Sequence, residues 1–393
     1  MAPMNAPKNK KQKTVAIVDE SDVEETTPMQ YELNVQAAAA KKDDKVPFGE
    51  EAHDEQIRLK LNSGGNLATL KGQTEMMKKI LRNAANCEVY VEMVMTEGGA
   101  YPAPMLVGPK KVLASDSAMA LAIGCNAVLK LLQSDPTTYA LALRRFQSDV
   151  IYANNCGKFV WDRVSAINFK FMLMARYLFD NGAFGMTQFT ASKNPDNRKR
   201  IANACVALLT ERAWVYRGAF KSSTANYKVK YVIPKEVNDM PYAIEWIWRF
   251  INLAFFGHGA GAVTFRTDQY PDESEPADIE NVGKEVPRAM VAYSATMLEI
   301  SIMDWSHGKK TPITLHDDTV REIFRWHDEN LIESAKTATG TAVLYSWLYK
   351  NAKAYKPAKI GKVEGPIQAT GKSARIRCTA EEMRARLAAL DAE

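Results

Sequence analysis

The chain has 393 residues, a formal net charge of +5, and a composition that is 46% hydrophobic and 9% aromatic. This apolar content supports a core large enough for two compact units, and it excludes a mainly disordered chain. No apolar run reaches the roughly 18 residues that span a bilayer, and the cysteines form no CxxC pair. Because the start is polar and rich in lysine, we expect no secretory signal and a reduced, intracellular setting.

The charge is distributed unevenly along the chain. Residues 1–56 hold 7 basic and 12 acidic side chains, whereas residues 193–235 hold 10 basic and 2 acidic ones. A second basic stretch, residues 336–378, holds 9 basic side chains and 1 acidic one. Basic side chains gathered in two stretches of a folded protein indicate a surface for a polyanion, and nucleic acid is the first candidate.

We predict four parts along the chain. Residues 1–56 form a flexible N-terminal arm, because they cannot bury enough apolar surface to offset the entropy of ordering. An N-terminal helical lobe covers 57–237, and a C-terminal helical lobe covers 238–355. Residues 356–393 form an extended C-terminal arm with a short terminal helix, which begins at the capping-box pattern Thr379-x-x-Glu382.

Hydrophobic periodicity predicts mostly helices in the N-terminal lobe. Alternation over Cys87–Met95 predicts a strand, and alternation within 221–235 predicts a further β segment. The segment 159–179 is apolar on all sides, which predicts a buried helix that stops at Asn181-Gly182. The predicted helices of this lobe cover 73–85, 116–132, 137–154, 159–179 and 195–216.

In the C-terminal lobe, Asp239 and Pro241 are typical of a helix start, and this helix ends at Gly257. Residues 268–285 are acidic and contain prolines, so we expect an exposed loop. The fold class that we predict is mainly α, with two helical lobes, a basic cleft between them and a small β element. The remaining predicted helices of this lobe cover 288–305, 318–334 and 341–354.

No pattern of catalytic residues is present. His307, His316 and His327 lie close together in the sequence, but their spacing matches no metal-ligand signature and favours ordinary surface or interface histidines. The glycine-rich segment 257–261 follows a helix rather than a strand, so a helix end is favoured over a phosphate-binding loop. We find no nucleophile elbow. We therefore expect no enzyme activity, no metal site and no cofactor.

Aromatic residues are interleaved with the basic stretches. This composition is typical of a surface that grips a single strand, because cations neutralise phosphates while rings stack on bases. For any single lysine, the alternative is an ordinary solvated surface. Eight side chains are our predicted phosphate contacts: Arg176, Arg198, Arg200, Arg212, Arg217, Lys228, Lys230 and Lys350.

The layout of an arm and two helical lobes with basic stretches resembles nucleocapsid proteins of RNA viruses, such as those of plant rhabdoviruses and their relatives. Met174–Asp180, followed by Asn194-Pro195-x-x-Arg198, also looks similar to a segment of flexuous filamentous plant-virus coat proteins. The local resemblance implies that Asp180 lies beside an RNA groove. About 175 residues follow the predicted helix Pro195–Arg217 here, far more than in those coat proteins, so the two-lobed nucleoprotein is favoured.

The resemblance implies a viral nucleocapsid (coat) protein that polymerises along single-stranded RNA through sequence-independent phosphate contacts. Its partners would be single-stranded RNA and further copies of itself, in a helical or ring homo-oligomer held by the two arms. We expect it in the virion and the host-cell cytoplasm, or in the nucleus, and on no membrane. Two alternatives stay open: a non-enzymatic scaffold for acidic protein partners, and an intracellular metal-dependent enzyme with a site near His307–His327.

Overall fold

The computed structural model describes the chain in segments, and every structural statement below concerns these residues. They are 54–62, 69–96, 99–101, 106–107, 110–111, 118–186, 189, 196–222, 229–235, 240–257, 262–274, 282–312, 318–337 and 341–356. The predicted N-terminal arm, 1–56, and the predicted C-terminal arm, 356–393, fall outside the described residues except for Asp54–Gln56 and Lys356.

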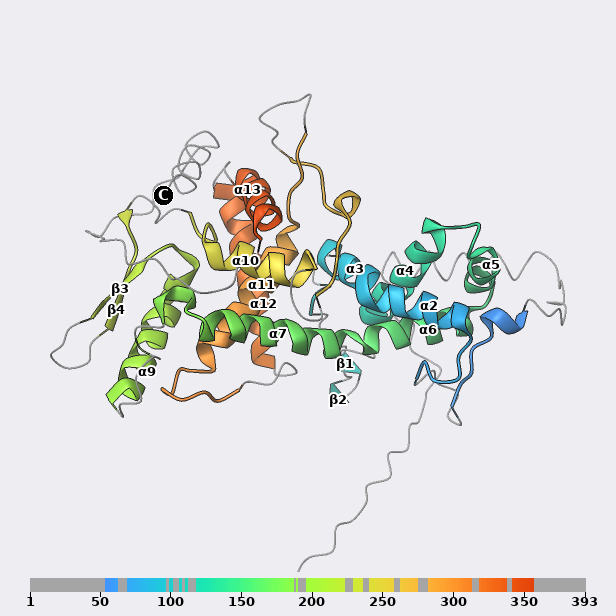
Figure 1. Ribbon diagram of the computed structural model, residues 1–393, viewed down its shortest axis with the longest axis horizontal. Helices are drawn as coiled ribbons and strands as arrows, with labels where there is room; N and C mark the ends of the chain where they lie inside the picture. Colours follow the sequence, from blue (N-terminus) through green and yellow to red (C-terminus); the bar gives the residue numbers. More distant parts are fainter. Residues whose placement is uncertain are drawn as a thin grey trace, which may run out of the picture.

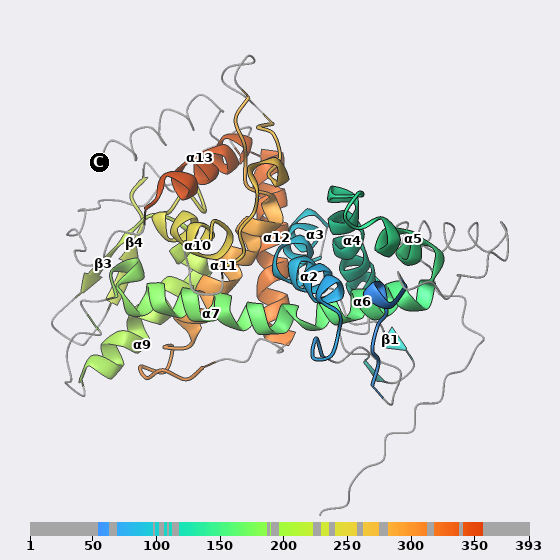
Figure 2. The ribbon, with the colours of Figure 1, turned by 45° about the vertical axis from the view of Figure 1, so that its right-hand side comes forward.

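The described helices form two groups that are joined by one long helix, α7 (Figures 1 and 2). The first group holds helices α2 to α6, and the second holds α9 to α13 together with a β-hairpin. The prediction of a mainly α fold with a small β element is confirmed. None of the described helices is both long and apolar enough to cross a membrane.

The first group begins with the short 3₁₀ turn η1 (Asp54–Ile57) and helix α2 (Glu75–Asn83). Thr74 caps α2, because its side-chain oxygen accepts a hydrogen bond from the backbone N–H of Met77 at 3.2 Å. The helix predicted over 73–85 is therefore confirmed, with its start set by a side-chain cap.

The chain then continues through a π-helical turn, η2 (Ala84–Glu88), into helix α3 (Val89–Met95). The strand predicted over Cys87–Met95 is wrong. Residues 89–94 are all buried, so the alternation in the sequence does not separate an inner face from an outer one. A helix satisfies its own backbone N–H and C=O groups, whereas a strand at this place would need a partner strand inside the core.

Three further helices complete the first group: α4 (Ala118–Ser134), α5 (Ala140–Ser148) and α6 (Val150–Asp162). The single helix predicted over 137–154 is broken at Asp149, whose φ of −120° and ψ of 96° are not helical. Asp149 caps α6 instead, because its carboxylate accepts the backbone N–H of Tyr152 at 2.9 Å.

Helices α4 and α6 cross at a very short distance. A Cβ atom added at Gly124 would lie 2.2 Å from the backbone oxygen of Gly157, and one added at Gly157 would lie 2.4 Å from Cys125 Sγ. Only a residue without a Cβ atom permits this approach. The two glycines therefore determine how tightly the first group packs.

Helix α7 (Val164–Asp180) follows α6 after a single residue, Arg163, and connects the two groups (Figure 1). The helix predicted over 159–179 is thus two helices, and the break falls four residues inside its predicted start. α7 stops at Asn181-Gly182, as predicted, and Gly182 takes the left-handed φ of 105° that ends many helices.

The second group consists of η4 (Ala183–Gly185), α9 (Asp196–Leu209), η5 (Thr210–Val215), α10 (Glu245–Phe255), η7 (Thr267–Gln269), α11 (Arg288–Met303), α12 (Asp318–Thr337) and α13 (Thr341–Ala354). Helix α11 lies at its centre, since every side chain from Ala289 to Ile302 is buried. It packs against α7, α9, α10 and α12. Of the four helices predicted in the C-terminal lobe, the last three are confirmed near their predicted bounds. The first, α10, begins at Glu245 and not beside Pro241, because Tyr242 has a φ of 67° and Ile244 is extended.

Two small antiparallel sheets accompany the helices. In the first, β1 (Leu106–Val107) pairs with β2 (Lys110–Lys111). In the second, β3 (Ala219–Ser222) pairs with β4 (Val229–Val232). The β segment predicted within 221–235 therefore contains β4, while its partner begins two residues before the predicted segment.

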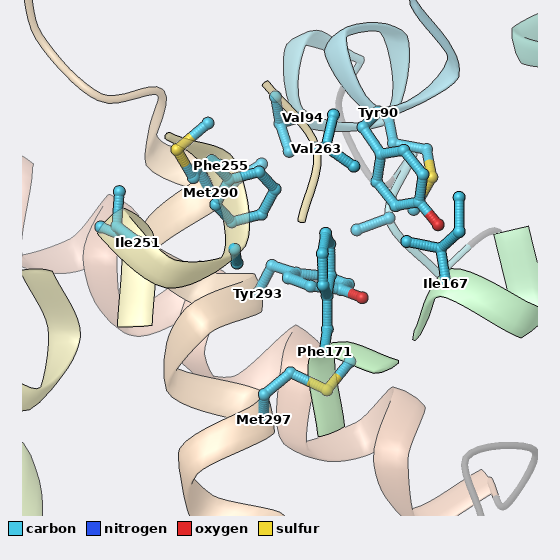
Figure 3. Packing of buried hydrophobic residues seen from close by; sticks show 14 of the residues in the cluster. Tyr90, Val94, Ile167, Phe171, Ile251, Phe255, Val263, Met290, Tyr293 and Met297 are labelled. Carbon is cyan, nitrogen blue, oxygen red and sulfur yellow. The ribbon is translucent and has the colours of Figure 1, made fainter. Parts of the chain in front are cut away.

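The buried apolar side chains form one continuous core through both groups. Figure 3 shows its middle, where Phe171 of α7 lies among Tyr90 of α3, Phe255 of α10 and Tyr293 of α11. The ring centroid of Phe171 is 5.4, 5.2 and 6.0 Å from these three rings. The predicted border at 237/238 does not divide this core, because α7 and α9 pack on α11, which lies beyond that border.

Candidate nucleic-acid interface

Helix α9 turns one side to the core and the other to solvent. Arg198 and Lys199, near its start, are exposed, whereas Arg200 is half-buried. A helix with charged side chains on its solvent side and apolar side chains on its other side is typical of the surface of a core. The buried side chains recur at helical spacing: Ile201, Ala204, Cys205 and Leu208.

The hairpin presents two lysines next to each other. Lys221 of β3 lies directly opposite Lys230 of β4, and both are exposed. Like charges in such a cross-strand pair are destabilising. Their neighbours Phe220 and Tyr231 form the adjacent pair on the opposite face, with ring centroids 5.2 Å apart. The Tyr231 hydroxyl donates to the Tyr216 carbonyl at 3.1 Å, so the aromatic face is held inward and the lysines outward.

A loop after α11 brings two further lysines to this surface. Gly308 has a φ of +72°, and a Cβ atom added there would lie 2.1 Å from the backbone oxygen of Arg198. The loop therefore lies directly against the start of α9. Lys309 and Lys310 follow and are exposed. Sequence reasoning missed both, because they belong to neither basic stretch and only the fold brings them to α9.

We call this surface the cationic end. It lies at one end of the molecule, where Figure 1 shows α9 and the hairpin, and its cations do not lie between the two groups of helices. α9 also packs against β4, which joins the three contributing segments. The cationic end comprises Arg198, Lys199, Lys221, Lys230, Lys309 and Lys310.

Asp180 lies at the edge of the cationic end. Its Oδ2 atom is 2.6 Å from Nζ of Lys310, and both side chains are about one-third exposed. An exposed pair of this kind contributes little to stability. Asp180 thus borders the basic surface, and its predicted place beside an RNA groove stays a prediction.

Arg176 has an internal partner. Its Nε atom donates to Oδ2 of Asp304 at 2.5 Å, and its Nη2 atom donates to Oδ1 at 3.2 Å. Arg176 is 7% exposed and Asp304 is 1% exposed. A two-point pair of buried charges holds the end of α11 to α7, and breaking it would leave an uncompensated charge. We therefore no longer include Arg176 among the expected phosphate contacts.

Arg212 also turns inward, toward a buried carboxylate on α11. Its Nε atom lies 3.1 and 3.0 Å from the two carboxylate oxygens of Glu299. The guanidinium carbon lies 3.9 Å from the ring centroid of Trp326, within the range of a cation–π interaction. Glu299 also accepts the indole N–H of Trp214 at 3.1 Å. The guanidinium of Arg212 thus binds groups within the protein, and we remove Arg212 from the expected phosphate contacts.

The same carboxylate ends a chain of hydrogen bonds. The Asn330 amide donates to the Tyr242 hydroxyl at 3.0 Å. The hydroxyl then donates to Nδ1 of His327 at 3.0 Å, which leaves Nε2–H of His327 to donate to Glu299, also at 3.0 Å. His327 is fully buried, so the prediction of an ordinary surface or interface histidine is wrong for this residue.

The surroundings determine the charge of this network. Burial raises the pKa of Glu299. The hydrogen bond from His327 and the charge of Arg212 together lower it by more, so the pKa of this carboxyl is below its ordinary value. Burial lowers the pKa of His327 more than its Glu299 contact raises it. The network therefore holds an ionised Glu299, a charged Arg212 and a neutral His327.

Three residues of this region have strained backbones. Glu211, Arg212 and Tyr242 have φ angles of 51°, 50° and 67°, in the left-handed region that residues with a side chain rarely adopt. Each such conformation costs on the order of 1–3 kcal/mol and persists where surrounding contacts determine it. Here those contacts are the hydrogen bonds to Glu299 and His327, together with the bond from Tyr242 N–H to the Val215 carbonyl at 2.6 Å.

The described residues contain no group of three or more His, Cys, Asp or Glu side chains that could hold a metal ion. His307 is exposed, and His316 lies outside the described residues. Gly257, which we expected at a helix end, has a φ of 80° just after α10. The buried network links η5, α11 and α12 through the hydrogen bonds to Glu299.

The other predicted contacts occupy different surfaces. Arg200 and Arg217 are half-buried, and both have interactions within the protein. Lys230 is exposed within the cationic end, and Lys350 is exposed on α13. Lys228 lies outside the described residues. Of the eight predicted contacts, Arg198 and Lys230 are therefore the two exposed ones that lie on packed neighbouring elements, α9 and β4.

A family model described as a domain of unknown function (DUF6532) matches residues 85–333. The chain belongs to this family. The matched region contains the whole cationic end and the complete network around Glu299 and His327. No curated protein and no solved structure matches the chain.

Proposed function

We propose that this DUF6532 protein binds single-stranded RNA through the cationic end, by phosphate contacts that do not read the base sequence. The observation that carries the proposal is the convergence of three segments far apart in the sequence. Helix α9, the hairpin and the loop after α11 each expose two basic side chains at this end. Clustered cations are the electrostatic footprint of a phosphate-binding surface.

The lysine pair of the hairpin supports the proposal most directly. Lys221 and Lys230 lie opposite each other on the two strands, where like charges repel. A bound phosphate between them would convert this repulsion into two attractive contacts. A charge arrangement that is unfavourable in the free protein and favourable in a complex supports a binding surface.

The test is a salt titration of RNA binding. We expect the double variant Lys221→Ala with Lys230→Ala to bind a short oligouridine strand more weakly than the wild type. The slope of log K against log salt should fall by about 0.7 for each lost phosphate contact. Fluorescence anisotropy at several salt concentrations measures both quantities.

A matched control changes two exposed lysines outside the cationic end, Lys71→Ala with Lys170→Ala. This control should keep the affinity and the slope of the wild type. If both double variants behaved alike, the cationic end would not be the binding surface. If wild-type protein bound polyglutamate as tightly as oligouridine, the alternative of a scaffold for acidic protein partners would replace the RNA proposal.

We further propose that copies of the chain assemble along the RNA as a nucleocapsid, in a virion or in host-cell cytoplasm. Helix α7 supports an assembly surface, because Phe169, Leu173 and Tyr177 are 51%, 47% and 46% exposed. They are spaced four residues apart and so share one face of the helix. Contiguous exposed apolar side chains mark surfaces that another molecule covers.

Electron microscopy with long RNA tests the assembly. Wild-type protein should form filaments or rings, whereas Leu173→Glu should leave separate particles because it places a charge in the apolar contact. The variant should still bind a short strand, since the cationic end is intact. Wild-type protein that stays dispersed on long RNA would exclude the nucleocapsid.

A further inference from the structure

The outward side of helix α10 carries an unusual group of side chains. Its inner side is apolar and buried, with Ile247 and Phe250 fully enclosed. Around the rest of the helix, Trp246, Trp248 and Arg249 are half-buried. Both tryptophans pack partly against the core and leave part of their rings at the surface.

An arginine lies between the rings of this group. The guanidinium carbon of Arg249 lies 4.9 Å from the ring centroid of Trp246, 5.6 Å from that of Trp248 and 5.4 Å from that of Tyr355. The rings of Trp248 and Tyr355 are themselves 5.3 Å apart. We call these four side chains the aromatic platform. Flat rings with a guanidinium among them are the surface on which unpaired bases stack.

The C-terminal side of the platform is fixed by α13, which packs on α10 (Figure 2). The side-chain amide of Asn252 donates to the carbonyls of Ala352 at 2.7 Å and Tyr355 at 3.0 Å. These bonds satisfy carbonyls that the end of α13 would otherwise leave unpaired, and they hold Tyr355 against α10. The ring is therefore positioned before any ligand arrives.

The platform lies between the two basic stretches. On one side, the Trp246 ring is 6.0 Å from the ring of Phe184 in η4, and η4 packs against β3 of the hairpin. On the other side, Tyr355 is followed by the exposed Lys356, one turn after the exposed Lys353. The rings thus connect the cationic end to the described part of the second basic stretch.

The polar contacts of Arg249 are incomplete. Its Nη2 atom lies 3.0 Å from Glu245, but its Nε atom is buried and has no hydrogen-bond partner among the described residues. A buried donor without an acceptor is costly. The oxygen and nitrogen edges of a nucleobase are acceptors that could satisfy it if the side chain shifts when a base binds.

We infer that the aromatic platform stacks unpaired bases of the strand whose phosphates the cationic end binds. This inference rests on the proposed function and refines its substrate class. Bases in a duplex are already stacked and cannot lie on the rings, so the protein selects single strands over duplexes. Because every base has a flat face, stacking is also tolerant of sequence.

The experiment compares two strands of equal length and charge, an oligouridine and a strand of the same length with abasic sugars. Full-length wild-type protein should bind the base-carrying strand about tenfold more tightly, as expected for stacked bases. Trp248→Ala should lose this preference while its affinity for the abasic strand is unchanged. Trp248→Phe, which keeps a flat ring, should retain most of the preference.

Two further variants separate this inference from the proposed function. The double variant Lys221→Ala with Lys230→Ala should weaken binding of both strands by the same factor. Ile151→Ala, which removes a 74% exposed apolar side chain from α6, should change neither affinity. Equal binding of the two strands by wild-type protein would overturn the platform and leave the phosphate contacts standing. Absence of binding to both strands would overturn the proposed function.

A protein partner on the platform is the competing occupant, because interface hot spots are also rich in tryptophan, tyrosine and arginine. That occupant predicts an unchanged strand preference in Trp248→Ala. Circular dichroism and thermal unfolding of each variant establish that it is folded. A folded Trp248→Ala protein that keeps the full preference for bases would overturn the inference.

Discussion

At the scale of single residues, the arginines of this molecule lie in two opposite environments, buried beside a carboxylate or exposed to solvent. Arg176 and Arg212 each meet a buried carboxylate, whereas Arg198 points to solvent. A buried arginine needs a partner because an isolated charge in the core is very costly. Glu299 is the best example, since three different donors converge on one carboxylate.

Removing the charge of Glu299 should therefore destabilise the fold strongly. We expect Glu299→Gln to lower the free energy of unfolding by about 3–5 kcal/mol, because it leaves Arg212 half-buried without its counter-charge. Urea denaturation followed by circular dichroism measures the loss. Glu322→Gln, at an exposed position of α12, is the control and should change stability by less than about 0.5 kcal/mol. A similar effect in both variants would contradict the role of Glu299.

The buried histidine makes stability depend on pH. The pKa of His327 in the folded state is below its ordinary value of 6.5, and that of Glu299 is below 4.5. At these two groups, unfolded chains therefore bind more protons than folded ones. Their contribution to the free energy of unfolding is present above pH 6.5 and falls as the pH decreases. For His327 alone the slope approaches about 1.4 kcal/mol per pH unit below its unfolded pKa.

Unfolding midpoints in urea between pH 7.5 and 5 measure this slope. His327→Gln should show a flatter curve over this range, because its side chain keeps hydrogen-bonding groups but does not titrate. Parallel curves for the two proteins would show that other groups cause the pH dependence.

At the scale of elements, the hairpin carries an aromatic pair on one face and a pair of like charges on the other. The aromatic pair Phe220 and Tyr231 packs inward, while Lys221 and Lys230 repel each other on the outer face. In the loop after α11, Gly308 holds the chain against α9, because only glycine fits against the backbone of Arg198. The hairpin and the loop after α11 are thus both positioned by contacts of uncharged residues.

Reversing one charge of the hairpin should therefore have opposite effects on folding and binding. In Lys230→Glu, the cross-strand repulsion becomes an attraction, which should raise the free energy of unfolding by about 0.2–1 kcal/mol. The same change should weaken RNA binding, and Lys230→Gln should lie between the two proteins in both measurements. Thermal unfolding and anisotropy titrations provide the data. Loss of both stability and binding would indicate that the charge matters only for folding.

At the scale of the whole molecule, one core runs through both groups of helices. Phe171 on α7 touches rings from α3, α10 and α11, so neither group is complete without the other. The division into residues 57–237 and 238–355 therefore does not correspond to two independent folding units. The surfaces that we propose for binding, at the cationic end and on α10, consequently lie on one continuous core.

The central position of Phe171 leads to a prediction with a control on the same helix. Phe171→Ala should lower the free energy of unfolding by about 3–5 kcal/mol, because it leaves a cavity in the shared core. Phe169→Ala, two residues earlier but 51% exposed, should change it by less than about 1 kcal/mol. Tryptophan fluorescence and circular dichroism should report one coincident transition in each protein. Two separate transitions in the wild type would contradict the single core.

Local patterns in the sequence were enough to predict the helical class, most helix positions, the stop at Asn181-Gly182 and the β segment near 229–232. These features depend on side chains a few residues apart, which meet whenever the helix or strand forms. Over Cys87–Met95 the periodicity could not distinguish a helix from a strand, because a segment buried on all sides has no exposed face. The break at Asp149 was missed for a related reason, since a residue that can cap a helix can also lie within one.

Only the tertiary structure decided which basic side chains face solvent. The partners of Arg176 and Arg212 are Asp304 and Glu299, roughly 90 to 130 residues away, and no spacing rule connects them. The same holds for Lys309 and Lys310, which reach the cationic end because a loop packs against α9. Composition determines how much charge a stretch carries, whereas the packing of distant segments determines whether that charge is neutralised inside the protein or presented to a partner.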